Sequence, residues 1–423
     1  MAGRFISAET PACDRHTSAR HQRRQRDASL YRMTEKNLKP DRNNCDLRID
    51  QRVLLPYGVV NDVDGRSVAL CKVNPSGGKD SALPGYEIFG VIGFLFAAYS
   101  IIANDSIQTL GTFLSSNSRR PWWVLWAYSS SIIIAVMVYG YFTLDGDIAF
   151  GRLNSIPYPE TGVKWWHALP PLILIFLTRA SIPVSTTFLV LTIFAMTGGA
   201  ATEGVLGKML IKSGLGYVVA LLAGGLVYLL VARTWERWVH DTKDRPLGLH
   251  WVMLQWASTA FLWSQWLMQD LANIFVFLPR QTIQSDNGTL VGFAISTLVL
   301  ATLVMVLFQA YIFATRGGEI QKIVLSKTNT TDIRSATLVD FIYGLILFFF
   351  KEVNDIPMST TWVFLGLLAG REIAIAYISG LRSRMAAIGD AGSDILRAFI
   401  GLIISVVLAI GMPWIATGQM PQF

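Results

Sequence analysis

The sequence predicts an all-α polytopic membrane protein, and three observations support this fold class. Apolar residues make up 52% of the 423-residue chain and charged residues only 15%, which is unlike a soluble globular protein. Several apolar runs reach the length of about 20 residues that crosses a bilayer as a helix. The order of these runs in the first half recurs in the second half, which predicts an internal repeat.

Eight segments carry this prediction. Four are almost free of polar residues, two have polar second halves, and two are interrupted near their middles. The first four are 122–143, 215–231, 290–314 and 395–416; the next two are 87–112 and 250–278; the interrupted ones are 165–198 and 337–377. Residues 86–233 and residues 250–416 therefore each contain a polar-ended helix, an apolar helix, an interrupted segment and a further helix.

The interrupted segments determine the predicted topology. If each is a re-entrant helical hairpin that returns to its starting side, each half crosses three times and the second repeat is inverted. The loops of one face then hold twelve Lys and Arg residues against five on the other. Cytoplasmic loops carry such an excess. We therefore expect an integral protein of the bacterial inner or plasma membrane, with both termini outside.

The first 85 residues differ from the rest of the chain. Residues 1–32 hold seven arginines and no apolar run, which is unlike a secretory signal peptide. We expect a basic segment without a packed fold, and Met33 is an alternative start. This segment and the cytoplasmic loops account for the net charge of +7, so we expect no nucleic-acid partner.

No catalytic or cofactor motif occurs in the sequence. Cys13, Cys45 and Cys71 precede the membrane region at irregular spacing, and no histidine stands at metal-ligand spacing from another ligand. Nucleotide-binding loops and nucleophile elbows are also missing. We therefore expect no enzyme, no cofactor and no ATP-driven transport, while a homodimer stays open.

Two hydroxyl clusters follow prolines inside the interrupted segments, in "IPVSTT" and "IPMSTT". Proline disfavours helix just before it, and hydroxyls then cap the helix that restarts. The free N–H groups and dipole of such a terminus attract anions. We expect two termini to enclose one tetrahedral oxyanion, held by Ser185, Thr186, Thr187, Ser359, Thr360 and Thr361. The alternative is that these hydroxyls bond to their own backbone or join helices.

Each half also places an aspartate beside an amide in apolar surroundings. These pairs are Asn104 with Asp105 and Gln269 with Asp270. Gln108 and Asn273 follow three residues after each aspartate, on the same helical face. A bare carboxylate in the bilayer needs a partner. Carboxylate and amide oxygens suit Na⁺, a proton is the other candidate, and an aspartate that caps a broken helix is the structural alternative.

Arg179 is a further candidate because it precedes Ser185 by six residues. Its guanidinium could pair with the bound anion. The alternative is that the side chain extends to the membrane surface.

These motifs resemble the inorganic phosphate transporter (PiT) family over roughly residues 87–416. The family carries Gly-Ala-Asn-Asp-x-Ala-Asn-x-x-Gly-Thr/Pro in each half, followed by Pro-Val-Ser-Thr-Thr. Residues 103–105, 111–112, 270–273, 183–187 and 357–361 match these patterns, the last with one apolar exchange. The chain departs from them at Gln108 and Gln269, where the family has asparagine.

The resemblance implies a symporter that imports inorganic phosphate by alternating access, coupled to Na⁺ or H⁺. It also implies an anion site that adds Gln108 and Asn273 to the six hydroxyl residues. The cation would be held by Asn104, Asp105, Gln269 and Asp270, with Na⁺ at the two aspartates. Sulfate or another oxyanion is the alternative substrate, and a non-transporting anion sensor or receptor is the alternative function.

Overall fold

The computed structural model describes residues 87–156, 158–159, 161–179, 184–197, 204–242, 244, 247–285, 288–315, 332–353, 359–379 and 383–418. The chain divides into two units, Met1–Gly78 and Lys79–Phe423, and all of these residues lie in the second. The predictions for residues 1–85, for Pro183 and Pro357, and for the side chain of Arg179 lie outside the described residues.

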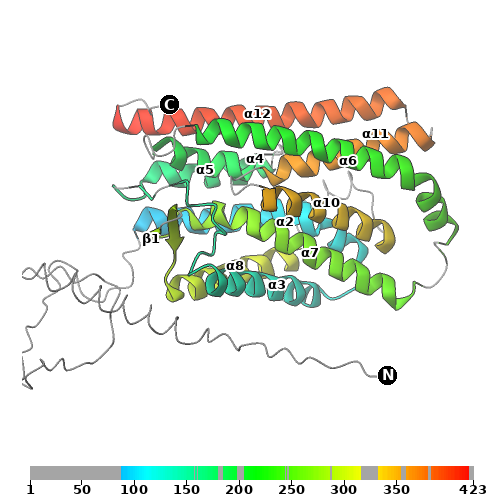
Figure 1. The fold of residues 1–423 in the computed structure, drawn as a ribbon, viewed down its shortest axis with the longest axis horizontal. Coiled ribbons are helices and arrows are strands. Elements are labelled where there is room, and N and C mark those ends of the chain that lie inside the picture. Colours follow the sequence, from blue (N-terminus) through cyan, green and yellow to red (C-terminus); the bar gives the residue numbers. More distant parts are fainter. Residues whose placement is uncertain are drawn as a thin grey trace, which may run out of the picture. The chain divides into compact units, whose positions relative to one another are not determined.

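The second unit is a bundle of helices with one short β-hairpin (Figure 1). Its elements are α2 (Ile88–Ser116), α3 (Trp122–Thr143), η1 (Trp165–Ala168), α4 (Leu169–Arg179), α5 (Thr186–Thr197), α6 (Val205–Asp241), α7 (Leu249–Phe275), β1 (Gln281–Ser285), β2 (Gly288–Gly292), α8 (Ile295–Ala314), α10 (Ile333–Val353), α11 (Thr360–Ser379) and α12 (Arg384–Thr417). Seven described helices, α2, α3, α6, α8, α10, α11 and α12, are long and apolar enough to cross a membrane. The predicted all-α polytopic membrane class is confirmed.

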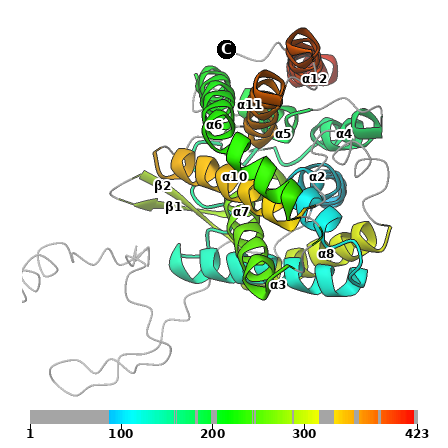
Figure 2. The same cartoon turned by 90° about the vertical axis from the view of Figure 1, so that its right-hand side faces the viewer.

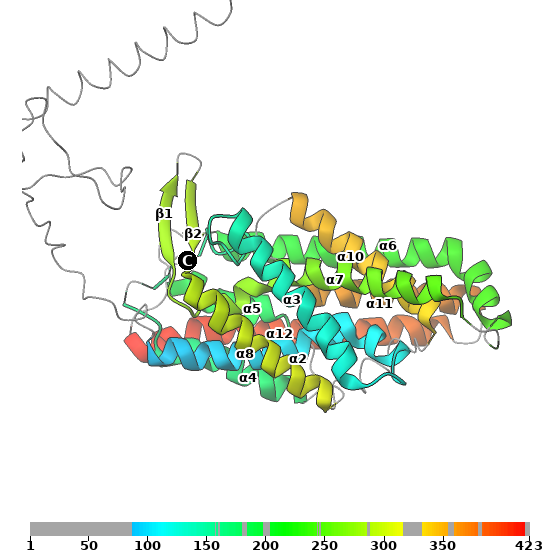
Figure 3. The ribbon, with the colours of Figure 1, turned by 90° about the horizontal axis from the view of Figure 1, so that it is seen from below.

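The hairpin is a feature that the sequence analysis missed. Strands β1 and β2 pair antiparallel, with Gln281 opposite Gly292, in a region expected to be a loop followed by helix. Figure 3 shows the hairpin at one end of the bundle, beyond the start of α8. The apolar residues at 290–293 therefore belong to β2 and the turn after it, so the helix begins later than predicted.

The helices form three groups when the bundle is viewed along their length (Figure 2). Helices α3 and α8 lie on one side, α2, α7 and α10 lie in the middle, and α4, α5, α6, α11 and α12 lie on the other side. Helix α7 is not among the seven apolar spans because its polar side chains, such as Gln255 and Gln265, lower its hydropathy. These side chains are buried inside the bundle, so a helix with polar side chains can lie among the apolar helices.

Both interrupted segments form two separate helices. In the first half α4 ends at Arg179 and α5 begins at Thr186; in the second half α10 ends at Val353 and α11 begins at Thr360. Each pair packs together, α4 against α5 and α10 against α11. The repeat boundaries, the inverted orientation of the halves and the side of each terminus stay predictions.

Helices α6 and α11 approach each other closely along glycines of α11. A Cβ added at Gly370 would lie 2.1 Å from the carbonyl oxygen of Leu221, and one at Gly366 would lie 2.3 Å from that of Tyr217. Small residues four apart permit such backbone contact between membrane helices. The glycines therefore set the distance between α6 and α11.

We expect Gly370→Ala to lower the thermal unfolding temperature of the purified protein. Alanine favours a helix over glycine by about 1 kcal/mol, but a methyl group here meets backbone that cannot move aside, and overpacking costs about 1–3 kcal/mol. The matched control is Gly389→Ala on α12, where an added Cβ meets no described atom within 4 Å. That variant should be as stable as the parent or more so. Equal stability of the two variants would contradict the close contact.

Candidate functional site

The two serines of the hydroxyl clusters lie at the starts of α5 and α11. The Oγ of Ser185 accepts a hydrogen bond from the N–H of Phe188 at 3.2 Å, and that of Ser359 accepts one from the N–H of Trp362 at 3.2 Å. Both serines are therefore N-caps. Each uses its oxygen for its own helix, as the structural alternative for these clusters foresees, and each keeps an O–H to donate.

The threonines that follow bond to carboxylates of other helices. Thr186 donates from Oγ1 to Asp105 Oδ2 at 2.8 Å, and Thr187 donates from Oγ1 to Asp270 Oδ1 at 3.2 Å. The side chain of Thr360, the first residue of α11, also interacts with the carboxylate of Asp270. These hydroxyls connect α5 and α11, on one side of the bundle, to α2 and α7 in its middle.

Two amides complete this arrangement. The Nδ2 of Asn273 lies 2.6 Å from Asp270 Oδ1 and 3.3 Å from the Oγ1 atoms of Thr186 and Thr187. On α2, Asn104 donates from Nδ2 to Asp105 at 2.6 Å. Seven predicted site residues, each at most 4% exposed, thus form one group that we call the carboxylate–hydroxyl cluster: Asn104, Asp105, Thr186, Thr187, Asp270, Asn273 and Thr360.

The two hydroxyl clusters also touch each other directly. Thr361 donates from Oγ1 to the carbonyl oxygen of Val184 at 3.4 Å, which joins the starts of α11 and α5. The N–H of Ser359 donates to the Oγ of Ser213 on α6 at 2.9 Å. Side chains from distant parts of the sequence therefore bring both restarted helices to one place.

Two further predicted residues make no hydrogen bond to the cluster among the described residues. Gln269 donates from Nε2 to the carbonyl oxygen of Leu347 at 3.3 Å, and Gln108 lies one turn along α2 from Asp105. Among the predicted site residues, three buried amide oxygens find no donor within the described part of the chain: Gln108 Oε1, Gln269 Oε1 and Asn273 Oδ1. Oxygens without donors are suitable ligands for a hard cation.

The electrostatics of the cluster are dominated by its two aspartates. Asp105 and Asp270 are both 0% exposed and repel each other. Two like charges buried together are costly unless a cation or proton compensates them. One compensating charge comes from Arg152, which is 1% exposed and interacts electrostatically with Asp270. Its Nε also donates to the carbonyl oxygen of Met268 at 3.1 Å.

Arg152 reaches the interior because the loop after α3 is folded. The carboxylate of Asp147 accepts backbone hydrogen bonds from Ala149 and Gly151, which shapes the turn before Arg152. Burial raises the pKa of the Asp147 carboxyl, against the opposing effect of these N–H donors and of Arg280. The loop is therefore packed against protein, whereas the sequence analysis treated it only as a loop between two predicted helical segments.

The sequence analysis missed three residues that border the cluster: Arg152, Ser213 and Tyr343. The hydroxyl of Tyr343 donates to the carbonyl oxygen of Thr360 at 3.1 Å, where α11 begins. Neither Ser213 nor Tyr343 belongs to a motif. The one available signal for Arg152 was its place in a connection rich in apolar residues, 148–156.

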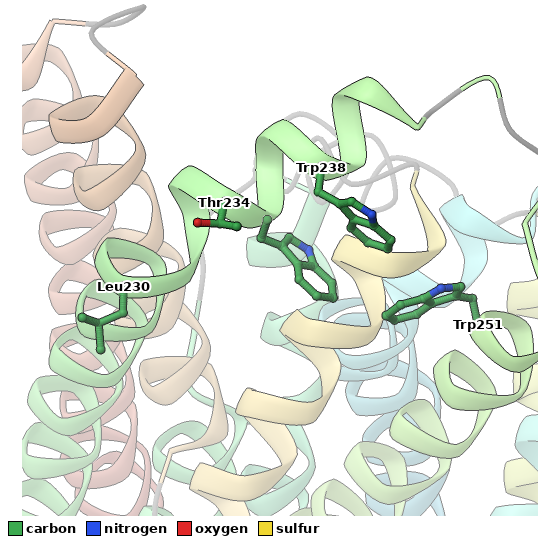
Figure 4. Close-up of a pocket in the computed structure, with 5 residues that line it drawn as sticks. Leu230, Thr234, Trp238 and Trp251 are labelled. Carbon is green, nitrogen blue, oxygen red and sulfur yellow. The ribbon is translucent and has the colours of Figure 1, made fainter.

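A separate pocket of about 420 Å³ lies at the ends of α6 and α7 (Figure 4). Its lining consists of Leu230, Thr234, Trp235, Trp238 and Trp251. The three indole rings pack with centroids 5.3 to 5.7 Å apart. The described side chains that line this pocket are uncharged and mostly aromatic, which is unlike an oxyanion site. Tryptophans at helix ends are typical of the membrane interface.

Comparison with known proteins assigns no family to this chain. No protein-family model matches the sequence, and no curated protein matches it. One solved structure that is similar is described as "The sodium-dependent phosphate transporter". The two share 14% sequence identity with a TM-score of 0.49, over 76% of this chain and 95% of that one. A likeness at this level carries neither a family nor a function over to this chain.

We expect Thr186→Val to destabilise the purified protein by about 1–3 kcal/mol, because Asp105 Oδ2 then loses its donor while staying buried. The matched control is Thr192→Val on the same helix. Thr192 is equally buried, and its Oγ1 has no partner among the described residues. Chemical unfolding should show a lower stability for the first variant and no such loss for the second. Equal effects would mean that the Thr186–Asp105 bond contributes nothing specific.

Proposed function

We propose that this protein is a cation-coupled symporter that imports inorganic phosphate by alternating access. One observation carries the proposal. The hydroxyls of Thr186 and Thr187 at the start of α5, which are natural donors to an oxyanion, donate instead to the buried carboxylates of Asp105 and Asp270, and Thr360 at the start of α11 interacts with Asp270. Seven apolar helices place this polar centre in an integral membrane protein. A polar centre between helices is where a transported solute can be held.

Charge explains why transport of an anion here would be coupled to a cation. An oxyanion beside two carboxylates is repelled by about 4 kcal/mol per charge pair at 4 Å, for an effective dielectric constant of about 20. A cation that binds Asp105 and Asp270 removes this repulsion. It also competes for the carboxylate oxygens, which releases the hydroxyls of Thr186 and Thr187 to the anion. The cation therefore binds first and the anion second.

The same atoms supply the ligands of the cation. Asp105 and Asp270 contribute carboxylate oxygens, and the amide oxygen of Gln269, which has no donor among the described residues, lies on the same helix as Asp270. Hard cations prefer oxygen ligands of this kind. Na⁺ is the first candidate. A proton on one of the aspartates would remove the same repulsion.

The acceptors around the cluster favour phosphate over sulfate. At neutral pH phosphate keeps one or two O–H groups, which can donate to carboxylate or amide oxygens, whereas sulfate only accepts. The amide oxygens of Gln108 and Asn273, the two amides assigned to the anion, have no donor among the described residues. A ligand that supplies donors satisfies them, and a ligand that only accepts leaves them unpaired.

Alternating access completes the proposal. The first predicted repeat contributes α2 and the start of α5 to the site. The second contributes α7 and the start of α11. Movement of one repeat against the other would open this single site to one face at a time. We place the protein in the bacterial inner or plasma membrane with both termini outside, on the basis of the loop charges.

We expect the purified full chain in proteoliposomes to take up labelled phosphate when a Na⁺ or proton gradient is imposed. Asp270→Asn should reduce uptake to background, because the cation loses a charged carboxylate ligand and one of the two acceptor oxygens is replaced by an NH2 donor. Thr192→Val, which changes the same helix as Thr187 but no described hydrogen bond, should keep the parental rate. Normal uptake by Asp270→Asn would remove this residue from the site.

Competition and binding measurements separate the alternatives. Uptake of sulfate that phosphate does not compete with would overturn the substrate assignment while keeping the transporter. Saturable phosphate binding without uptake under either gradient would instead indicate a sensor or receptor.

A further inference from the structure

Asp340 of α10 is a buried carboxylate outside the carboxylate–hydroxyl cluster. It is 1% exposed, and both of its oxygens accept hydrogen bonds from threonines. Thr112 of α2 donates to Oδ1 at 2.5 Å, and Thr259 of α7 donates to Oδ2 at 2.7 Å. Among the described residues no Lys, Arg or His forms an ion pair with it. A carboxylate at this depth is costly while charged, and proton binding removes the cost.

Few titratable groups surround Asp340. Tyr128 of α3 interacts with it electrostatically, and Tyr343 lies one turn further along α10. Arg334, on the same helix, is paired with Asp332 at 2.7 Å. Helix α10 packs against α2, α6, α7 and α11. The charged or titratable side chains described on those four helices are Tyr99, Asp105, Lys208, Lys212, Tyr217, Tyr228, Asp241, His250, Asp270, Arg371, Glu372 and Tyr377, and none of them is bonded to Asp340.

A chain of polar side chains leads from Asp340 to the end of α2. Thr259 accepts from Gln255 at 3.4 Å, and Gln255 accepts from Asn117 at 2.9 Å. Asn117 in turn accepts from the Nε of Arg120, which is exposed, at 3.2 Å. The amides are not proton carriers themselves. They run from Asp340 toward the face of the bundle where α2 ends.

The threonines around Asp340 suit both protonation states of the carboxyl group. When the carboxylate is charged, both hydroxyls donate to it, as observed. When it binds a proton, the new O–H needs an acceptor, and either Thr112 or Thr259 can rotate to accept it. The hydroxyl that rotates can donate to the carbonyl four residues earlier in its own helix. Neither state leaves a buried polar atom unpaired.

The predicted repeat indicates that this polar group is not needed for packing. The offset of 165 residues between Asp105 and Asp270 relates Thr112 to Phe277 and Thr259 to Phe94. The offset of 174 residues between Ser185 and Ser359 relates Asp340 to Trp166. The corresponding positions of the other half are therefore aromatic. Phe277 packs on Phe194 with ring centroids 5.1 Å apart, so that end of the bundle is closed by apolar contacts.

We infer that Asp340 is a proton-binding site, separate from the carboxylate–hydroxyl cluster, which exchanges its proton with the face where α2 ends. Helix α10 links the two places. Tyr343 donates to the backbone of Thr360, and the carbonyl oxygen of Leu347 accepts from Gln269. The inference that Asp340 binds a proton does not depend on the proposed function. The role of this proton in driving uptake rests on the proposed function.

Infrared difference spectroscopy tests the proton site without transport. The purified full chain in lipid nanodiscs is compared between alkaline and acidic buffer, with the carboxylic C=O band as the readout. We expect a band that grows on acidification, is lost in Asp340→Asn and is kept in Asp105→Asn. In Thr259→Val the band should remain but shift, because one hydrogen-bond partner of the carboxyl group is gone.

Three results would overturn the inference. The first is a band of unchanged size in Asp340→Asn. The second is a band whose frequency does not change in Thr259→Val. This variant tests the inference even if Asp340→Asn fails to fold. The third is loss of the band when Na⁺ is added at constant pH, since that result would make Asp340 a sodium site.

Uptake in proteoliposomes then tests the coupling role. We expect phosphate uptake by Asp340→Asn to lose its dependence on pH, and an entrapped pH dye should report no proton entry with phosphate. An unchanged pH profile in this variant would overturn the coupling role. A protein that shows the Asp340 band but no phosphate uptake would contradict the proposed function and leave the proton site supported.

Discussion

Two carboxylates of like charge, Asp105 and Asp270, are buried together inside a membrane protein, and the polar structure is organised around this pair. Neither aspartate can be satisfied from its own helix alone. The donors that they require come from hydroxyls and amides, and one positive charge comes from Arg152. A pair that is compensated mostly by neutral donors still favours a cation, and the proposal of cation-coupled transport rests on this preference.

The interruptions in two helices supply those donors. A continuous helix uses its backbone N–H groups internally, whereas a helix that begins inside the bundle presents free N–H groups and capping hydroxyls. Ser185 and Ser359 satisfy part of each terminus, so the following threonines are left for the carboxylates. Glycines of α11 bring it close to α6, where Ser213 accepts the N–H of Ser359. The close packing of α6 and α11 therefore also places Ser213 within hydrogen-bond distance of the start of α11.

Much of the site could be predicted because its residues lie in short motifs that occur twice. Seven predicted residues, from Asn104 to Thr360, belong to one hydrogen-bonded cluster. The residues that were missed have no such local signature. Tyr343 and Ser213 reach the site from other helices, and Arg152 reaches it from a folded loop. Strands β1 and β2 were missed because an apolar run at a helix start reads the same as a strand.

The sequence by itself determined the membrane class, the helix interruptions and the polar residues placed in apolar surroundings. Composition, hydrophobic run length and proline chemistry act locally, so they can be read without knowing the fold. Only the tertiary structure decided which hydroxyl serves which group. The serines of the Ser-Thr-Thr motifs cap their own helices, whereas Thr186 and Thr187 donate to aspartates of α2 and α7 and Thr360 interacts with Asp270. Those partners are chosen by distances of about 3 Å between separate helices, which packing sets and local sequence does not encode.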